Sequence, residues 1–172
     1  MACRDRPGQA CDYGSQVPWL RLSFEVARPI GEVFAWHRDT RNAALISPPS
    51  IRVASVQGRF PLEKGDEVRL VVSPRGLPVR QRWLIHIEEL VEPERIVDRM
   101  LEGPFRSWRH EHRFEDLGGE RTRVTDDVEY RLPRLFAWAE PLARWQLART
   151  FAYRHRRSRE LLEASRDAKT SS

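Results

Sequence analysis

Two histidines lie two residues apart in a segment that alternates between charged and inward-type side chains. In residues 106–116, His110 and His112 share their parity with Trp108 and Phe114. Side chains alternate across a strand, and the charged side chains of the opposite parity must face water. We therefore expect both imidazoles to face the interior of the fold. An imidazole titrates near neutral pH, so it can transfer a proton or bind a metal.

An aspartate lies on the next predicted strand, residues 121–131. Asp126 has the inward parity of its apolar neighbours, and it lies opposite His110 if Asp116 pairs with Glu120 across the intervening turn. A slip of one residue is excluded because it turns one charged face inward. A slip of two residues stays open and makes the contact between His110 and Asp126 diagonal, still within reach of long side chains.

A second aspartate reaches the same place from the preceding strand. If Leu101 pairs with Ser107, Asp98 lies opposite His110. We therefore expect an inward polar cluster of Asp98, His110 and Asp126 across three neighbouring strands. Two carboxylates beside one imidazole raise its pKa and favour the imidazolium. A buried cluster of this kind must be hydrogen-bonded to be tolerated.

Three interpretations of this cluster stay open. The aspartates can orient a core histidine, or the cluster can line a pocket and hold the polar group of a mostly apolar ligand. In an enzyme, His110 would move protons with Asp98 or Asp126, and these three would be the catalytic residues. His110 and His112 could share a metal, but no third ligand stands out beyond the same aspartates. We therefore expect no metal and no cofactor.

Aromatic side chains and one arginine extend the candidate site. Four tryptophans fall on inferred inward faces, which fits either core packing or an aromatic-lined cavity. Arg149 interrupts the apolar stripe of the last predicted helix, where it would bind a ligand carboxylate or extend to the rim. The candidate ligand-binding residues are Trp83, Asp98, Trp108, His110, His112, Asp126, Tyr130, Trp138, Trp145 and Arg149.

Changes in periodicity predict the elements that position these residues. Alternation over 20–26 predicts a strand, and helical spacing after Pro29 predicts a short helix, followed by another at 40–46. Turn residues then separate six strands, at 51–57, 67–73, 79–90, 94–101, 106–116 and 121–131. After Pro133, a stripe predicts a helix of roughly 30 residues that runs to about Leu162. The members of this stripe are Leu135, Trp138, Leu142, Trp145, Arg149, Ala152 and Tyr153.

This order predicts an α+β fold. Strands joined by short turns form an antiparallel meander, and the long helix is the only element large enough to cover its apolar face. A curved sheet around one helix leaves a natural pocket. We expect a flexible tail at 1–17, one domain at 18–165 and a flexible tail at 166–172.

Composition narrows the classes of function. The 172 residues suit one domain, and all but two of the 30 basic residues are arginines interleaved with 25 acids, so the net charge of +5 predicts no nucleic-acid partner. No stretch approaches the ~20 apolar residues that span a bilayer, so no integral membrane association is expected. Cys3 and Cys11 have no partner in the domain, which is typical of a reducing cytoplasm.

The element order and one motif resemble a known superfamily. The motif is Gly103-Pro104-Phe105, then Trp108, His110, His112 and Phe114, with Phe151-Ala152-Tyr153-Arg154 near the end. Together they resemble the START-like superfamily, also called SRPBCC, and within it a bacterial subfamily similar to polyketide cyclases and dehydrases. The resemblance implies a helix-grip fold, in which a curved antiparallel sheet of about seven strands wraps around a long C-terminal helix. It does not imply a particular reaction.

Three functions follow as hypotheses. The first is binding of an apolar or amphipathic small molecule, of lipid, polyketide or aromatic type, between sheet and helix. The second, implied by the superfamily, is a cyclase, dehydratase or aromatase with a His–Asp acid/base pair. The third is docking of a protein partner on a basic helix face formed by Arg154, Arg156, Arg157 and Arg159. A homodimer also stays open.

Overall fold

The computed structural model describes residues 17–76 and 78–170, without the side chains of 165–170. Most of the N-terminal segment expected to be a tail, 1–16, and residues 171–172 lie outside the described residues. The elements in chain order are β1 (Trp19–Val26), α1 (Ile30–His37), η1 (Thr40–Ala44), β2 (Ile51–Gln57), β3 (Glu67–Pro74), β4 (Gln81–Val91), β5 (Arg95–Glu102), β6 (Ser107–Gly118), β7 (Arg121–Arg131), η2 (Arg134–Ala139) and α2 (Glu140–Thr170).

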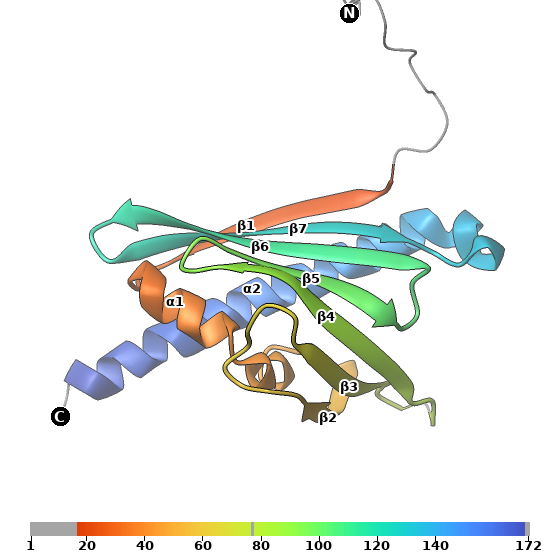
Figure 1. Cartoon of the computed structure of the whole chain (residues 1–172), viewed down its shortest axis with the longest axis horizontal. Helices are drawn as coiled ribbons and strands as arrows, with labels where there is room; N and C mark the ends of the chain where they lie inside the picture. Colours follow the sequence, from red (N-terminus) through yellow and green to blue (C-terminus); the bar gives the residue numbers. More distant parts are fainter. Residues whose placement is uncertain (1–16, 77, 171–172) are drawn as a thin grey trace, which may run out of the picture.

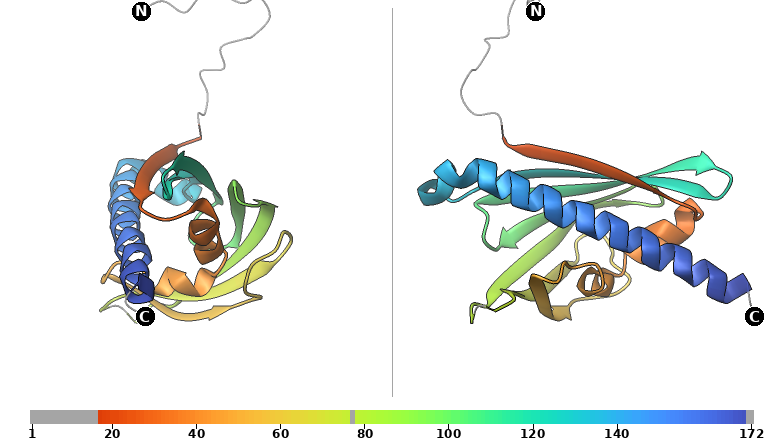
Figure 2. Two further views of the ribbon diagram at one scale, coloured as in Figure 1. Left: turned by 90° about the vertical axis from the view of Figure 1, so that its left-hand side faces the viewer. Right: turned by 180° about the vertical axis from the view of Figure 1, so that it is seen from behind.

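The strands form one antiparallel sheet in the order β1-β7-β6-β5-β4-β3-β2. The six strands from β2 to β7 are therefore a simple meander, and β1 joins the far edge beside β7 (Figure 1). The sheet curls, and α2 lies along its open side while α1 and η1 close one end (Figure 2). The predicted α+β helix-grip architecture is confirmed, with both short helical elements after the first strand.

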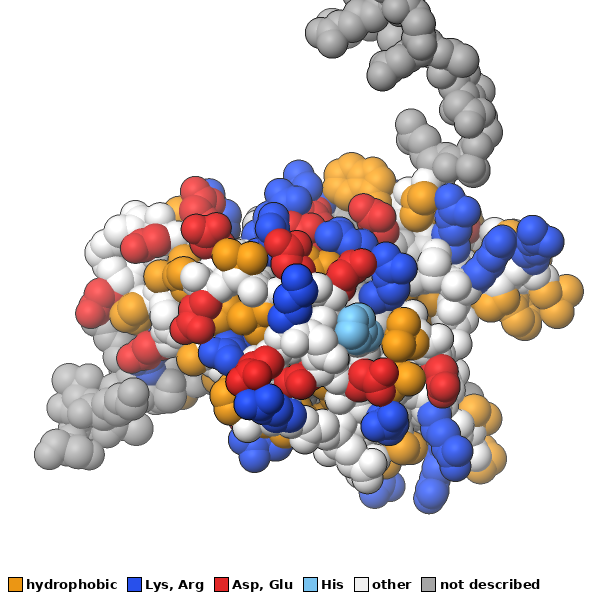
Figure 3. Space-filling view, in the orientation of Figure 1, with side chains coloured by type: hydrophobic (Ala, Val, Ile, Leu, Met, Phe, Trp, Pro, Cys, Tyr) orange, Lys and Arg blue, Asp and Glu red, His pale blue; other side chains and the backbone are white. Residues whose placement is uncertain are grey.

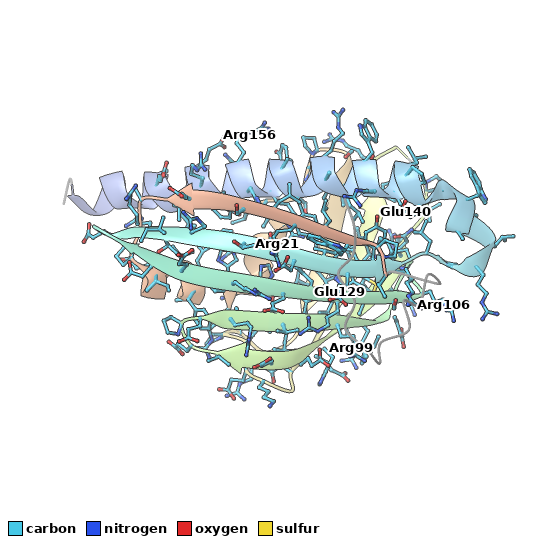
Figure 4. The ribbon with its side chains drawn as sticks, turned by 90° about the horizontal axis from the view of Figure 1, so that it is seen from above. Arg21, Arg99, Arg106, Glu129, Glu140 and Arg156 are labelled. Atoms are coloured by element: carbon cyan, nitrogen blue, oxygen red, sulfur yellow. The ribbon has the colours of Figure 1, made fainter. Side chains whose placement is uncertain are left out.

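Alternation along β6 and β7 gives the sheet two chemically different faces. Val124, Asp126, Val128 and Tyr130 of β7 are all buried on the concave side. The outer side carries charged residues, among them Arg21, Arg99 and Glu129 (Figure 4). Along these two strands, residues of one parity are mostly apolar or aromatic and those of the other parity are mostly charged. The face on which each of them lies was therefore predictable from the sequence.

Helix α2 packs through a face that the sequence did not predict. Its buried residues are Phe151, His155, Ser158 and Leu162. By contrast, the expected stripe is exposed at its N-terminal end, with Trp138 79% exposed. The other large exposed side chains there are Leu135, Phe136, Leu142 and Trp145.

The physical reason for this error is the mixed chemistry of the true interface. A histidine and a serine interrupt the buried stripe, whereas the purely apolar stripe belongs to η2 and the first turns of α2. These lie at the end of the molecule where Figure 3 shows hydrophobic side chains gathered on the surface. None of the helices in the described chain is long and apolar enough to cross a membrane.

A pair of substitutions tests this corrected orientation. Trp138→Ala is expected to change the free energy of unfolding by less than about 0.5 kcal/mol, because the indole is already in water. Leu147→Ala removes a half-buried side chain that packs against Phe151 and its neighbours, and is expected to cost about 1–2 kcal/mol. Urea unfolding of both variants measures the difference. A larger loss for Trp138→Ala would contradict this orientation.

Candidate functional site

Strand register brings the predicted polar cluster together from β5, β6 and β7. Asp98 pairs with His110 across β5 and β6, as the sequence predicted. Across β6 and β7, however, His112 rather than His110 lies opposite Asp126. The preferred pairing was thus wrong by two residues, the slip that the sequence left open.

The turn between β6 and β7 explains the slip. Gly118 pairs with Arg121, so the loop consists of Gly119 and Glu120, with φ values of 60° and 56°. Two consecutive residues with positive φ are the usual hairpin connection, because their twist matches that of the strands. The ladder is irregular between Asp116 and Gly118, and this bulge shifts the pairing.

Asp126 is the centre of the resulting network. His112 Nδ1 donates to its Oδ1 over 2.6 Å, and His155 Nε2 of α2 donates to its Oδ2, also over 2.6 Å. His110 Nε2 lies 3.3 Å from Oδ1, but this buried nitrogen has no partner in hydrogen-bond geometry among the described residues. The same imidazole presents Nδ1 to Asp98 Oδ2 at 3.4 Å.

These contacts separate the protonation states of the cluster. Burial lowers the pKa of His110, but Asp98 and Asp126 outweigh it and raise that pKa to about 9. Burial and the charge on His110 lower the pKa of His112. Burial opposes ionisation of Asp126, yet the two imidazoles hold its pKa well below the usual value. His110 is therefore a cation beside a neutral His112 at neutral pH.

A cavity of about 170 Å³ lies beside this cluster, between the sheet, α1, η1 and α2. One wall is apolar and comes from β2, β3 and β4, with Val68, Leu70, Val72, Trp83, Ile85 and Ile87 among its residues. The adjoining wall contains Asp98, Trp108, His110, His112 and Arg154, and Asp98 pairs directly with Ile87 across β4 and β5. Its volume is close to the roughly 150 Å³ that accommodates a benzene molecule.

Several predicted site residues lie elsewhere. Tyr130 is buried in a cluster with Leu20 and Val128, and its hydroxyl donates to Glu140 over 2.9 Å. Trp145 is 53% exposed, and the guanidinium of Arg149 lies 4.8 Å from its ring centroid, at the surface. Tyr130, Trp138, Trp145 and Arg149 therefore do not line the cavity, whereas Asp126 lies behind the histidines that do.

Three residues of the site were missed by the sequence analysis. His155 belongs to the buried face of α2, and its spacing of four from Phe151 was the available signal. Arg154, which the sequence places on the basic helix face of the third hypothesis, lines the cavity, and burial lowers its pKa against the attraction of Asp126 and Asp98. His37 lines the cavity beside His112, and burial lowers its pKa to about 3.

The basic run on α2 does not form one docking face. Arg154 faces the cavity, and Arg159 donates to the backbone oxygen of Glu25. Arg156 points away from the sheet, as Figure 4 shows, and it lies 3.8 Å from Glu160. The third hypothesis, a partner surface made by all four arginines, therefore lacks a common face.

One family model matches the chain. It is described as "Domain of unknown function (DUF8410)" and matches residues 75–162, just over half of the chain. The matched segment includes β4 to β7 and most of α2, and so contains the whole His–Asp cluster. No curated protein sequence matches the chain.

Solved structures share the fold. The Zhui aromatase/cyclase from Streptomyces sp. R1128 has a TM-score of 0.64 at 22% identity, covering 88% of this chain and 95% of that one. A START superfamily protein from Mycobacterium smegmatis has a TM-score of 0.63 at 13% identity, with coverages of 85% and 97%. Norcoclaurine synthase from Thalictrum flavum, in complex with dopamine and hydroxybenzaldehyde, has a TM-score of 0.60 at 14% identity, with coverages of 91% and 97%. The chain therefore has a START-like fold.

Proposed function

The chain belongs to the DUF8410 family, whose description assigns no function, and on this premise we propose that it binds a small amphipathic molecule in its cavity. The observation that carries the proposal is the division of the cavity between an apolar wall and a polar one. Such a division is typical of ligand pockets, in which apolar burial supplies affinity and a few polar groups fix orientation.

The dimensions and charges favour a particular class of ligand. A volume of about 170 Å³ suits roughly one ring, so of the three expected types the aromatic one is favoured over a lipid or an extended polyketide. Arg154 and the His110 imidazolium are donors at the polar wall. A carbonyl, hydroxyl or carboxylate oxygen would be the matching polar group on the ligand.

An acid/base enzyme of cyclase or dehydratase type is the second candidate. It is favoured by the approach of Asp98 and His110 to the cavity, where a proton could pass to or from a ligand. His110→Ala separates the two functions. A catalytic His110 should lower turnover by orders of magnitude, whereas in a binding protein the change should alter affinity only modestly.

Four finer assignments belong to the same proposal. Membership of the bacterial subfamily with the Gly103-Pro104-Phe105 motif is supported by the position of that motif inside the matched segment. A cytoplasmic location is supported by the presence of only two cysteines. The homodimer and the domain limits at 18 and 165 remain predictions, and α2 continues to Thr170.

Native mass spectrometry of the freshly purified protein tests the proposal. The wild type is expected to retain a small molecule that organic extraction releases for identification. Val72→Phe fills part of the cavity and should lose this molecule, whereas Val71→Phe adds the same ring on the other face of β3 and should retain it. Retention of the molecule by Val72→Phe would place its binding outside the cavity.

A further inference from the structure

Three side chains present ligand atoms to one point on the polar wall of the cavity. Asp98, His110 and His112 each have one such atom within 4.8 Å of the others. His110 Nδ1 is 3.4 Å and His112 Nε2 is 4.0 Å from Asp98 Oδ2. Ligands of one ion with bonds near 2.1 Å are about 3.0–3.4 Å apart, so small side-chain rotations would complete a metal site.

Asp126 determines which nitrogens remain available. Its Oδ1 accepts the hydrogen bond from His112 Nδ1, so the lone pair of the neutral ring is on Nε2, which faces Asp98. His155 donates to the other oxygen and fixes the carboxylate in turn. This is the usual environment of a metal-binding imidazole, whose second nitrogen donates to a carboxylate.

One buried nitrogen of His110, for which the described part of the chain offers no hydrogen-bond partner, fits the same arrangement. His110 is 4% exposed, and its Nε2 lies 3.3 Å from Asp126 Oδ1 without hydrogen-bond geometry. A metal on Nδ1 fixes the single proton of the ring on Nε2. A small rotation that brings Nδ1 to the metal would then allow the Nε2 proton to form a hydrogen bond with Asp126, as the Nδ1 proton of His112 does.

We propose that Asp98, His110 and His112 bind one divalent transition-metal ion, of the class of Zn²⁺ and Fe²⁺. Two imidazoles and one carboxylate are a donor set that these ions favour, and the carboxylates of Asp98 and Asp126 offset the two charges. All three ligands line the cavity, so the remaining coordination positions face the space in which a ligand would bind. Asp126 and His155 are positioning residues.

The sequence analysis considered a metal shared by the two histidines but expected none, because no third ligand stood out beyond the aspartates of the cluster. Register places Asp98 within reach of both histidines, and this makes it the third ligand. The inference depends on the geometry of the cluster and goes beyond the proposed small-molecule binding. A probe metal tests the metal site without any organic ligand. A failed metal test would therefore leave the small-molecule proposal intact, and a failed ligand test would leave the metal site intact.

Titration of the full-length, EDTA-treated protein with Co²⁺ is the direct test. We expect saturable visible absorption at one ion per chain, with displacement by Zn²⁺. Asp98→Asn and His112→Gln should each weaken binding by at least about 100-fold, and Asp126→Asn by about 10–100-fold. His86→Gln is the matched control, because His86 lies on β4 outside the cavity wall and should leave affinity unchanged.

Two results would overturn the metal site. One is the absence of saturable Co²⁺ binding by the folded wild type. The other is wild-type affinity in folded Asp98→Asn and His112→Gln. If these variants do not fold, anomalous scattering from wild-type crystals soaked in Co²⁺ decides the question: an ion between the three side chains supports the site, and its absence from that position overturns it.

Discussion

Asp126→Asn is expected to destabilise the protein by about 3–5 kcal/mol, which is the range measured when one member of a buried charged pair is removed. The carboxylate accepts hydrogen bonds from His112 and His155, and its charge faces the His110 imidazolium. An amide keeps the size of the side chain but removes the charge and replaces one acceptor with a donor. Urea unfolding monitored by circular dichroism measures the loss.

Asp127→Asn is the matched control for this substitution. Asp127 follows in sequence on the opposite face of β7 and pairs with Arg21, whose side chain is 53% exposed. The side chain of Asp127 is itself 14% exposed and also lies 3.7 Å from Arg113, but both arginines are more than half exposed. Each such pair contributes about 1 kcal/mol or less, so the control is expected to lose up to about 2 kcal/mol, less than Asp126→Asn. Equal losses in the two variants would contradict the central position assigned to Asp126.

The stability of the metal-free protein is expected to fall as the pH rises from about 6.5 to about 9. His110 has an ordinary pKa of 6.5 when unfolded and about 9 when folded. Its imidazolium therefore contributes stability that is fully present below the unfolded pKa and is lost as the pH passes the folded pKa. The contribution is on the order of 3 kcal/mol.

Several charged and titratable groups surround this imidazole, and a variant isolates its contribution. Asp98 and Asp126 stabilise the cation, while burial and the neighbouring His112 oppose it. In His110→Gln, the free energy of unfolding should vary much less over this pH range. A parallel pH dependence in wild type and variant would show that another group is responsible, as would an NMR titration of His110 with a midpoint near 6.5.

The sequence predicted which residues face the interior more reliably than which residues meet. Parity placed Asp98, His110, His112 and Asp126 on the concave face, because a charged face inside the sheet would cost far more than any local preference. Pairing across β6 and β7 depends instead on the loop at Gly119 and Glu120 and on the bulge before it. The expected turn, between Asp116 and Glu120, and the observed turn, at Gly119 and Glu120, use almost the same residues. Their energies differ too little for the sequence alone to decide between them.

Helix α2 shows a second limit of sequence reasoning. Its existence followed from helical spacing, but it begins at Glu140, after the 3-10 helix η2, and it continues past the expected end at Leu162 to Thr170. Its buried face includes His155 and Ser158 because Asp126 supplies a partner for the imidazole. That partner lies on another element, so hydrophobicity along the helix could not reveal it. The same missing tertiary information hid the inward position of Arg154.

The proposed function requires that the cavity accept a small molecule, and an NMR titration with phenol and benzene measures this directly. Methyl resonances of Val68, Leu70 and Ile87 should shift saturably with both probes, because these side chains form the apolar wall. Phenol should also perturb the ring of His112 on the polar wall. Shifts confined to the exposed Trp138 and Trp145, with none at the cavity wall, would contradict the proposed binding site.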